Sequence, residues 1–242
     1  MKSILTRILL IFSIIFLYGE AYSQYIVVPM DPSQTDHLKA YGAAYWILQE
    51  GEDIDWLLNY RGGSFLMQHS EKIENEMRIR GVLYQVIREA DVVSIQNTIA
   101  ENNMESVKLE KAPEIAIYSP PNKQPWDDAV TMALTYAEIP YTVLWDEEVL
   151  TGQLEEYDWL HLHHEDFTGQ YGKFYSNYGG AQWYIESQLL SETVARKLGF
   201  SKVSDEKKSV AQWIRDYVSE GGFMFAMCSA CDSFDISLAS GD

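Results

Sequence analysis

Apolar and polar positions along the first half of the chain predict strands that alternate with helices. Short β-rich runs are bounded by turn residues, and the segments between them have helical spacing or a polar, helix-forming composition. The predicted elements are strands at 25–29, 54–60 and 82–87 and helices at 36–50, 71–80 and 91–102. This alternation indicates a sheet that is covered by helices.

A polar segment, 103–113, separates this half from a second series of elements. The predicted strands are 115–118, 141–144, 159–163 and 223–227, and the predicted helices begin near 127, 182, 205 and 232. The run at 223–227 is apolar throughout, as expected for a strand buried on both faces. We therefore predict a flavodoxin-like α/β protein, with mostly parallel sheets and helices on both faces. Its expected subdomains, 24–112 and 113–242, either stand apart or share one sheet.

Residues 1–23 have the composition of a secretory signal peptide. A basic start precedes an apolar run at 8–17, and small residues follow at the spacing that a signal peptidase reads. The apolar run is too short to cross the roughly 30 Å hydrocarbon core of a membrane as a helix. We expect cleavage between Ser23 and Gln24 and an exported protein, periplasmic or extracellular. The alternative is an N-terminal anchor that stays attached.

The composition is strongly acidic. Lysine and arginine total 18 against 36 aspartates and glutamates, and the resulting net charge of −18 repels nucleic acid and anionic lipid. The hydrophobic content of 47% is ample for a core and argues against disorder. Two cysteines are too few for a disulfide framework. Neither nucleic acid nor, after signal cleavage, a membrane is an expected partner.

Cys228 directly follows the apolar run at 223–227, where a strand turns into a helix. In a parallel α/β sheet, ligands bind beyond the carboxyl ends of the strands. Small neighbours, including Ser229 and Ala230, suit the tight turn of a nucleophile elbow. The first N–H groups of the following helix would favour a thiolate and bind an oxyanion. The alternative is a cysteine that only packs at the strand end, because free cysteines are often buried.

Histidines and acids crowd the end of the strand predicted at 159–163. Strand alternation places His161 and His163 on one face and His164 on the other. Two histidines and a carboxylate are a familiar zinc set. Acids stand, however, where metallo-hydrolase motifs carry aspartate and histidine, so no metal is predicted. The simpler interpretation packs His161 in the sheet and leaves the others at a polar strand end.

This strand end also offers a base for the cysteine. If the strand neighbours the one that precedes Cys228, His163 or His164 can approach the thiol and accept its proton. We therefore predict Cys228, His163 and His164 as the catalytic residues. The expected oxyanion and pocket residues are Ser229, Ala230, Tyr118, Ser119, Glu165 and Asp166.

The C-x-x-C sequence and an aromatic segment each allow more than one interpretation. Cys228 and Cys231 form a C-x-x-C sequence at a helix start, which in an oxidising compartment indicates thiol–disulfide chemistry or two unrelated thiols. Residues 167–184 are rich in aromatic side chains and glycine. Long segments of this kind are often functional, so they form either a lid or stacking surface over a pocket or a cover for the core.

Several motifs resemble known proteins. Residues 113–239 resemble the class I glutamine amidotransferase-like fold, in which a cysteine elbow follows a central strand. Nearly the whole chain after residue 23 is similar to a secreted bacterial family commonly labelled asparagine synthetase B. The matching stretches are His37–Gly42, Trp56–Ser64, Pro125–Val130, Leu160–Gln170 and Phe225–Ser229.

The chain also departs from what these resemblances imply. Asparagine synthetase uses an N-terminal cysteine and a Ser-Gly-Gly-x-Asp-Ser loop for ATP, and neither occurs here, so ATP-dependent asparagine synthesis is not expected. Amidotransferases carry their catalytic histidine after the elbow, whereas the eleven residues after Cys231 include none. Members of the family extend beyond position 242, so the resemblance implies a C-terminally truncated chain.

Three hypotheses follow for a small-molecule, glycan or peptide ligand, and none requires a cofactor. The first is a cysteine-dependent amide or C–N hydrolase that uses Cys228. The second is a non-catalytic binding module with a pocket at the strand ends. The third is a thiol–disulfide protein that uses Cys228 and Cys231.

Overall fold

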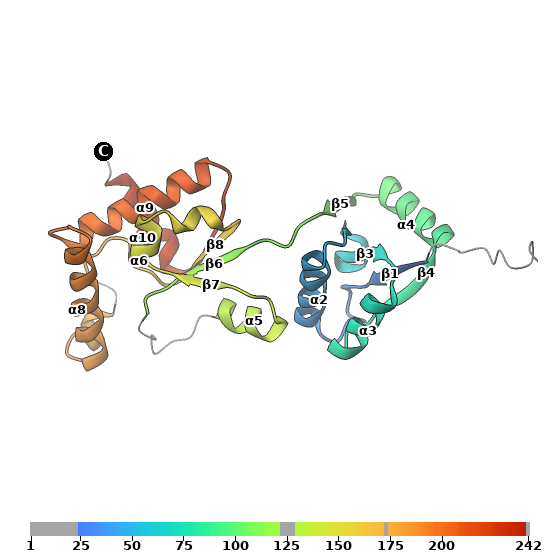
Figure 1. Cartoon of the computed structure of the whole chain (residues 1–242), viewed down its shortest axis with the longest axis horizontal. Coiled ribbons are helices and arrows are strands. Elements are labelled where there is room, and N and C mark those ends of the chain that lie inside the picture. The colour runs from blue at the N-terminus through green and yellow to red at the C-terminus, as the bar shows by residue number, and fades with distance from the viewer. Residues whose placement is uncertain (1–23, 122–128, 172–173, 241–242) are drawn as a thin grey trace, which may run out of the picture. The chain divides into compact units, whose positions relative to one another are not determined.

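The computed structural model describes residues 24–121, 129–171 and 174–240 (Figure 1). The chain divides into two compact units, Met1–Lys111 and Ala112–Asp242, which we call unit 1 and unit 2. The predicted signal peptide and part of the motif at 125–130 lie outside the described residues. None of the helices in the described ranges has the length and apolar content that a membrane span requires.

Unit 1 contains a five-stranded antiparallel sheet with the strand order β4-β1-β3-β2-β5. Its strands are β1 (Gln24–Val28), β2 (Ile54–Leu58), β3 (Ser64–Gln68), β4 (Gln85–Arg88) and β5 (Glu105–Leu109). β1 pairs with β3 and β4, and β2 pairs with β3 and β5, in every case antiparallel. The sequence pattern predicts neither β3 nor β5.

The prediction of mostly parallel, flavodoxin-like sheets is therefore wrong. Five of the nine strands in the described part of the chain belong to the antiparallel sheet. β2 and β3 form a hairpin, and the left-handed backbone of Asn59, Arg61, Gly62 and Gly63 reverses the chain directly between them. A parallel pair would have needed a crossover of a dozen or more residues.

Helices cover both faces of this sheet, which explains why the sequence pattern predicted parallel strands. From residue 24 onward, the α-helices of unit 1 are α2 (His37–Gln49), α3 (Glu71–Arg80) and α4 (Glu89–Glu101). Along β1, Val27 packs in a cluster with Ile95 and Ile99 of α4, while Ile26 and Val28 are buried as well. A strand buried on both faces loses the alternation that marks a half-exposed antiparallel strand.

Unit 2 contains a four-stranded parallel sheet with the order β7-β6-β8-β9. Its strands are β6 (Ile115–Tyr118), β7 (Thr142–Leu144), β8 (Trp159–Leu162) and β9 (Phe223–Ala226). β6 pairs with β7 and β8, and β8 pairs with β9, so all four carboxyl ends meet at one edge. This edge positions the candidate site.

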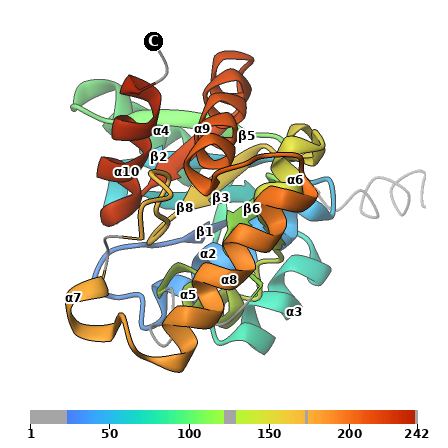
Figure 2. The same cartoon turned by 90° about the vertical axis from the view of Figure 1, so that its left-hand side faces the viewer.

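The two faces of the unit 2 sheet carry different helices. One face packs against α6 (Asp146–Leu150), α9 (Val203–Ser219) and α10 (Ser229–Ala239) in one continuous apolar core. The helix α5 (Ala129–Ala137) lies on the other side of β6 and β8 in both views (Figure 1, Figure 2). A further helix, α8 (Gln182–Lys197), contacts α9.

The prediction that the strand at 223–227 is buried on both faces is also wrong. β9 is an edge strand, and Phe223 and Phe225 are 59% and 46% exposed, so it is not buried on both faces. The next helix, α10, begins at Ser229, three residues before the predicted start at Asp232. Cys228 is therefore the N-cap residue of α10, and the strand turns into the helix at the cysteine itself.

Candidate functional site

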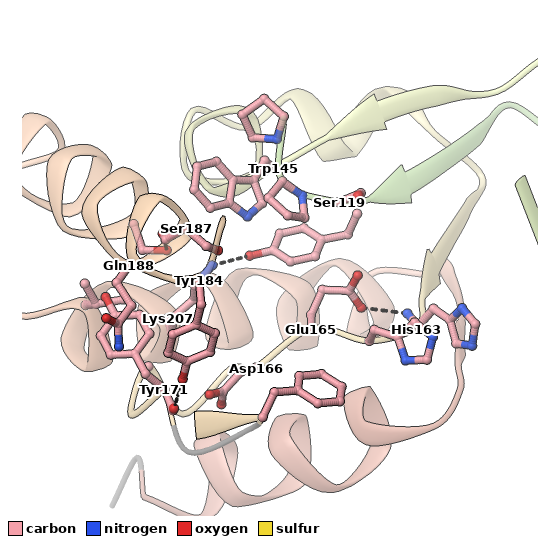
Figure 3. A pocket seen from close by; sticks show the side chains of 18 of the residues that line it. Ser119, Trp145, His163, Glu165, Asp166, Tyr171, Tyr184, Ser187, Gln188 and Lys207 are labelled. Carbon is pink, nitrogen blue, oxygen red and sulfur yellow. Dashed lines mark hydrogen bonds between the residues drawn. The ribbon is translucent and has the colours of Figure 1, made fainter. Parts of the chain in front are cut away.

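A pocket of about 710 Å³ lies at the carboxyl edge of the parallel sheet in unit 2 (Figure 3). Its lining comes from the last residues of β6 and from β7, from the residues that follow β6, β7 and β8, from Thr131 of α5, from one side of α8, and from the start of α9. Ligands of α/β proteins bind at this edge because loops, rather than packed strands, follow the carboxyl ends. The pocket is thus the first candidate site of the chain.

A buried ion pair forms part of the pocket wall. Lys207 donates from Nζ to Oδ1 and Oδ2 of Asp146, at 2.7 and 2.6 Å, and to the hydroxyl of Tyr118 at 3.0 Å. The ammonium also lies over the ring of Trp145, 4.9 Å from its centroid. These acceptors use all three N–H donors of Lys207, so its charge is neutralised inside the protein.

Two neutral acids surround this pair. Tyr118 donates its hydroxyl proton to Asp146, and burial together with the charge of Asp146 raises the pKa of Tyr118 well above its usual value. Glu206 is fully buried, and burial followed by the charge of Asp146 raises its pKa to about 8. Both shifts favour the neutral form of Tyr118 and of Glu206 beside the ion pair.

Four polar residues follow β8 and line the pocket. The rings of His163 and His164 stack with centroids 3.7 Å apart, so both side chains lie on the same side of the site. Glu165 accepts the backbone N–H of His163 at 2.6 Å, and Asp166 accepts the backbone N–H of Thr168 at 2.9 Å. These bonds hold the segment in a fixed turn, with half-buried carboxylates at the pocket.

The turn at Cys228 has a strained backbone. Its φ of +53° and ψ of −135° fall in a region that side-chain-bearing residues rarely adopt. Holding a residue in such a region costs about 1–3 kcal/mol, and this strain is concentrated at active sites and switch regions. The Cys228 thiol is exposed and free, as is that of Cys231 in the first turn of α10.

Two hydrogen bonds attach this turn to the histidine segment. Ala230 donates its backbone N–H to the carbonyl of His163 at 3.3 Å, and Ser233 donates its hydroxyl to the carbonyl of Glu165 at 2.7 Å. The start of α10 is thus fixed beside the end of β8. Cys228 itself is not among the described residues that line the pocket.

The remaining predicted residues separate into pocket and core. Ser119 lines the pocket, and its backbone N–H donates to the carbonyl of Leu144 at 2.9 Å. Ala230 is fully buried, and its N–H is engaged by carbonyl groups, so it anchors the turn. His161 is fully buried in the sheet, with its ring stacked on Phe225. Across the described ranges, no three His, Cys, Asp or Glu residues are grouped closely enough to hold a metal ion.

The aromatic segment at 167–184 divides between core and pocket. Phe167 is buried and stacks on Tyr118 with ring centroids 5.2 Å apart, so it belongs to the core. Trp183 and Tyr184 lie in the first turn of α8 and line the pocket. Tyr184 donates its hydroxyl proton to the carbonyl of Tyr171, which joins α8 to the loop after β8.

Of the buried cluster, sequence reasoning predicted Tyr118, which lines the pocket, and missed Lys207, Asp146 and Glu206, as well as the α8 wall. Lys207 lies on the apolar stripe of α9, four residues after Val203 and three before Val210, and this position was a usable signal. A lysine at such a position must be paired when it is buried. Ser187 and Gln188 of α8 gave no signal, because polar residues on a helix resemble an ordinary solvated face.

Comparisons of the chain with protein-family models, with curated proteins and with solved structures find no match. The resemblance to the family labelled asparagine synthetase B therefore stays a prediction. The assignment of function depends on the geometry of unit 2.

Proposed function

We propose that the chain is a cysteine-dependent hydrolase of amide or other C–N bonds, with Cys228 as its nucleophile. The observation that carries the proposal is the left-handed, strained backbone of this exposed cysteine, between β9 and α10. A cysteine that only fills space has no need of this conformation, whereas a nucleophile elbow holds its residue on such a strand-to-helix turn.

The reaction would proceed in two stages. The Cys228 thiolate attacks the carbonyl carbon of the substrate, the C–N bond breaks, and the nitrogen leaves as an amine after taking up a proton. Water then hydrolyses the thioester, which releases a carboxylic acid and restores the thiol. His163 or His164 is the candidate for the proton transfers, because the turn of Cys228 is bonded to the segment that carries them.

An activated ester tests this proposal. p-Nitrophenyl acetate should give a burst of p-nitrophenolate and an acetyl group on Cys228, located by peptide mass spectrometry. Cys228→Ser should abolish the burst, whereas Cys231→Ser, which removes another exposed thiol three residues away, should retain it. The proposal would be contradicted if no acetyl group were found on Cys228, or if both cysteines were acetylated equally.

A non-catalytic binding module is the second candidate. The observation that favours it is the absence of Cys228 from the described pocket lining. In that case a ligand would occupy the 710 Å³ pocket without contact to the thiol. Binding that is unchanged in Cys228→Ser, together with no acylation in the wild type, would favour this function.

The cellular location of the protein is part of the same proposal. Export through the segment at 1–23 would place the enzyme in the periplasm or outside the cell. The ligand would be a small molecule, a glycan fragment or a peptide. Detection of a mature chain that begins at Gln24 would support the setting without testing the chemistry.

A further inference from the structure

Cys231 is a second thiol beside the proposed nucleophile, and the proposed mechanism does not use it. It is the third residue of α10, whereas Cys228 is the N-cap residue of the same helix. Both thiols are exposed and free, so a small reagent in solution can reach either of them. The sequence contains no other cysteine, so an internal disulfide of this chain must join these two residues.

The backbone holds the two cysteines within the span of a disulfide. Cys231 donates its backbone N–H to the carbonyl of Cys228 at 3.2 Å, which closes a four-residue turn. Such a turn places its first and fourth Cα atoms less than about 7 Å apart, and disulfides join Cα atoms at about 4.4–6.8 Å. The side chains of an N-cap residue and of the third helical residue also reach the same end of the turn, as in a capping box. The observed backbone is therefore compatible with a bond between the two sulfurs.

The rest of unit 2 fixes this turn in place. Met227 donates its backbone N–H to the carbonyl of Leu162 at 2.8 Å, directly before the turn. Ala230, which lies between the cysteines, is fully buried and donates its N–H to the carbonyl of His163. A fixed turn holds the second thiol at a high effective concentration near the first. The folded chain should therefore favour ring closure more than the same four residues do in a flexible chain.

We infer that Cys228 and Cys231 form a reversible disulfide across the first turn of α10, and that this bond controls whether Cys228 is available as a nucleophile. The inference rests on the proposed function in one respect, because it concerns the regulation of the same thiol. The thiolate is the nucleophilic form of cysteine, and a sulfur in a disulfide has no thiolate. The hydrolase would therefore be active in its reduced form and inactive in its oxidised form.

A small disulfide such as glutathione disulfide is a sufficient oxidant. The thiolate of one cysteine attacks this disulfide, the S–S bond breaks, and one glutathione leaves as a thiolate. The other protein thiolate then attacks the protein sulfur of the mixed disulfide, which forms the Cys228–Cys231 bond and expels the second glutathione. The two protein thiols are oxidised, the glutathione disulfide is reduced, and both thiol protons end on the released glutathione.

Equilibration of the full chain with mixtures of reduced and oxidised glutathione tests the disulfide. After acid quenching and alkylation, mass spectrometry should show a single chain that has lost two hydrogen atoms and carries neither glutathione nor an alkyl group. The same chain unfolded in guanidinium chloride is the control, because it keeps the C-x-x-C sequence but loses the turn. The equilibrium constant for ring closure should be at least about tenfold larger in the folded chain.

Three results of this experiment would overturn the inference. They are equal constants in the folded and the unfolded chain, glutathione adducts that persist at equilibrium, and a disulfide between two chains. The comparison uses the unchanged sequence, so it does not depend on the folding of a variant.

Single-cysteine variants test the pairing itself. Cys231→Ser leaves Cys228 without its partner, so oxidation should stop at the mixed disulfide between Cys228 and glutathione. Cys228→Ser should stop in the same way at Cys231. Loss of two hydrogen atoms without an adduct in either variant would contradict a bond between these residues.

Reactivity measurements separate this inference from the proposed function. Oxidation should lower the rate of Cys228 with iodoacetamide by at least about a hundredfold, and dithiothreitol should restore it. Ring closure with this protection, but without acetylation of the reduced chain by p-nitrophenyl acetate, would contradict the hydrolase alone. Acetylation of reduced Cys228 without ring closure would contradict the switch alone. Repeated disulfide transfer to insulin would show a thiol–disulfide catalyst and would also contradict the switch.

Discussion

Lys207 binds both carboxylate oxygens of Asp146 inside unit 2, with Nζ–O distances of 2.7 and 2.6 Å. The lysine side chain is 9% exposed and the aspartate is fully buried, so both charges are largely removed from bulk water. The pair joins the start of α6 to α9 at the wall of the pocket. The integrity of the site therefore depends on an ion pair that the mechanism does not use directly.

Removal of the lysine charge should destabilise unit 2. Lys207→Met leaves Asp146 buried without its cation, and the loss of one partner of a buried pair costs about 3–5 kcal/mol. Lys208→Met is the matched control, because the hydrogen bond described for this neighbouring lysine goes to the carbonyl of Ser240 at an exposed position. Denaturant unfolding should show a large decrease for the first variant and a change within about 0.5 kcal/mol for the second.

A double variant tests the cause of this loss. Lys207→Met combined with Asp146→Leu removes both charges and should be more stable than Lys207→Met alone, because no buried anion is left unpaired. If the double variant is less stable than the single one, the lysine acts through packing and the account of the pair is wrong.

Glu206 should make stability depend on pH in the opposite sense to most carboxyl groups. Its pKa is about 8 in the folded chain, against an ordinary value of 4.5, because the group is buried beside Asp146. The folded state thus holds this proton more tightly than the unfolded state does. The contribution of Glu206 to the free energy of unfolding is therefore fully present below pH 4.5 and is lost as the pH rises through about 8.

Glu206→Gln isolates this contribution. The amide has almost the same volume and does not ionise, so the variant should match or exceed wild-type stability at pH 8 and lose its advantage near pH 5. Thermal unfolding of both proteins across this range measures the difference. A constant offset between them at every pH would show that Glu206 does not titrate as described.

The elements of the fold could be predicted where local signals decide them. The bounds predicted for α3 agree with those observed, where Ser70 caps the first turn and Gly81 adopts the left-handed conformation after the last one. β3 was missed because it follows the Gly62-Gly63 turn directly, and β5 because its composition is polar. The pairing of strands depends on such missing partners, so the parallel prediction failed.

The site was predictable only in part, for a related reason. The turn at Cys228 and the polar end of β8 follow from local patterns, since a strand end can be read from the sequence. The Lys207–Asp146 pair joins residues 61 positions apart, and no local pattern encodes that contact. The same limit applies to the α8 wall, whose polar residues resemble a solvated surface.

The hairpin turn of unit 1 should tolerate no side chain at Gly62. A Cβ at this position would lie 2.3 Å from the backbone oxygen of Met30, and the φ of +81° adds strain. Gly51 has the same φ with no atom within 4 Å, so Gly51→Ala measures the conformational cost alone, about 1–2 kcal/mol. Gly62→Ala should lower the free energy of unfolding by clearly more, and equal losses would contradict the close approach to Met30.

The strain at Cys228 can be measured without its chemistry. Cys228→Gly and Cys228→Ala both remove the thiol, but only glycine adopts a φ of +53° without a steric penalty. Cys228→Gly should therefore be the more stable variant, by about 1–3 kcal/mol. If alanine is equally stable, the turn relaxes when the thiol is absent and the backbone stores no strain.

The most direct test of the proposed nucleophile compares two thiols in one molecule. Cys228 and Cys231 are both exposed and free at the start of α10, but only Cys228 occupies the strained turn beside the histidine segment. Alkylation by iodoacetamide near neutral pH, followed residue by residue with mass spectrometry, should modify Cys228 at least about tenfold faster than Cys231. Equal rates at the two positions would contradict the claim that the turn makes Cys228 a nucleophile.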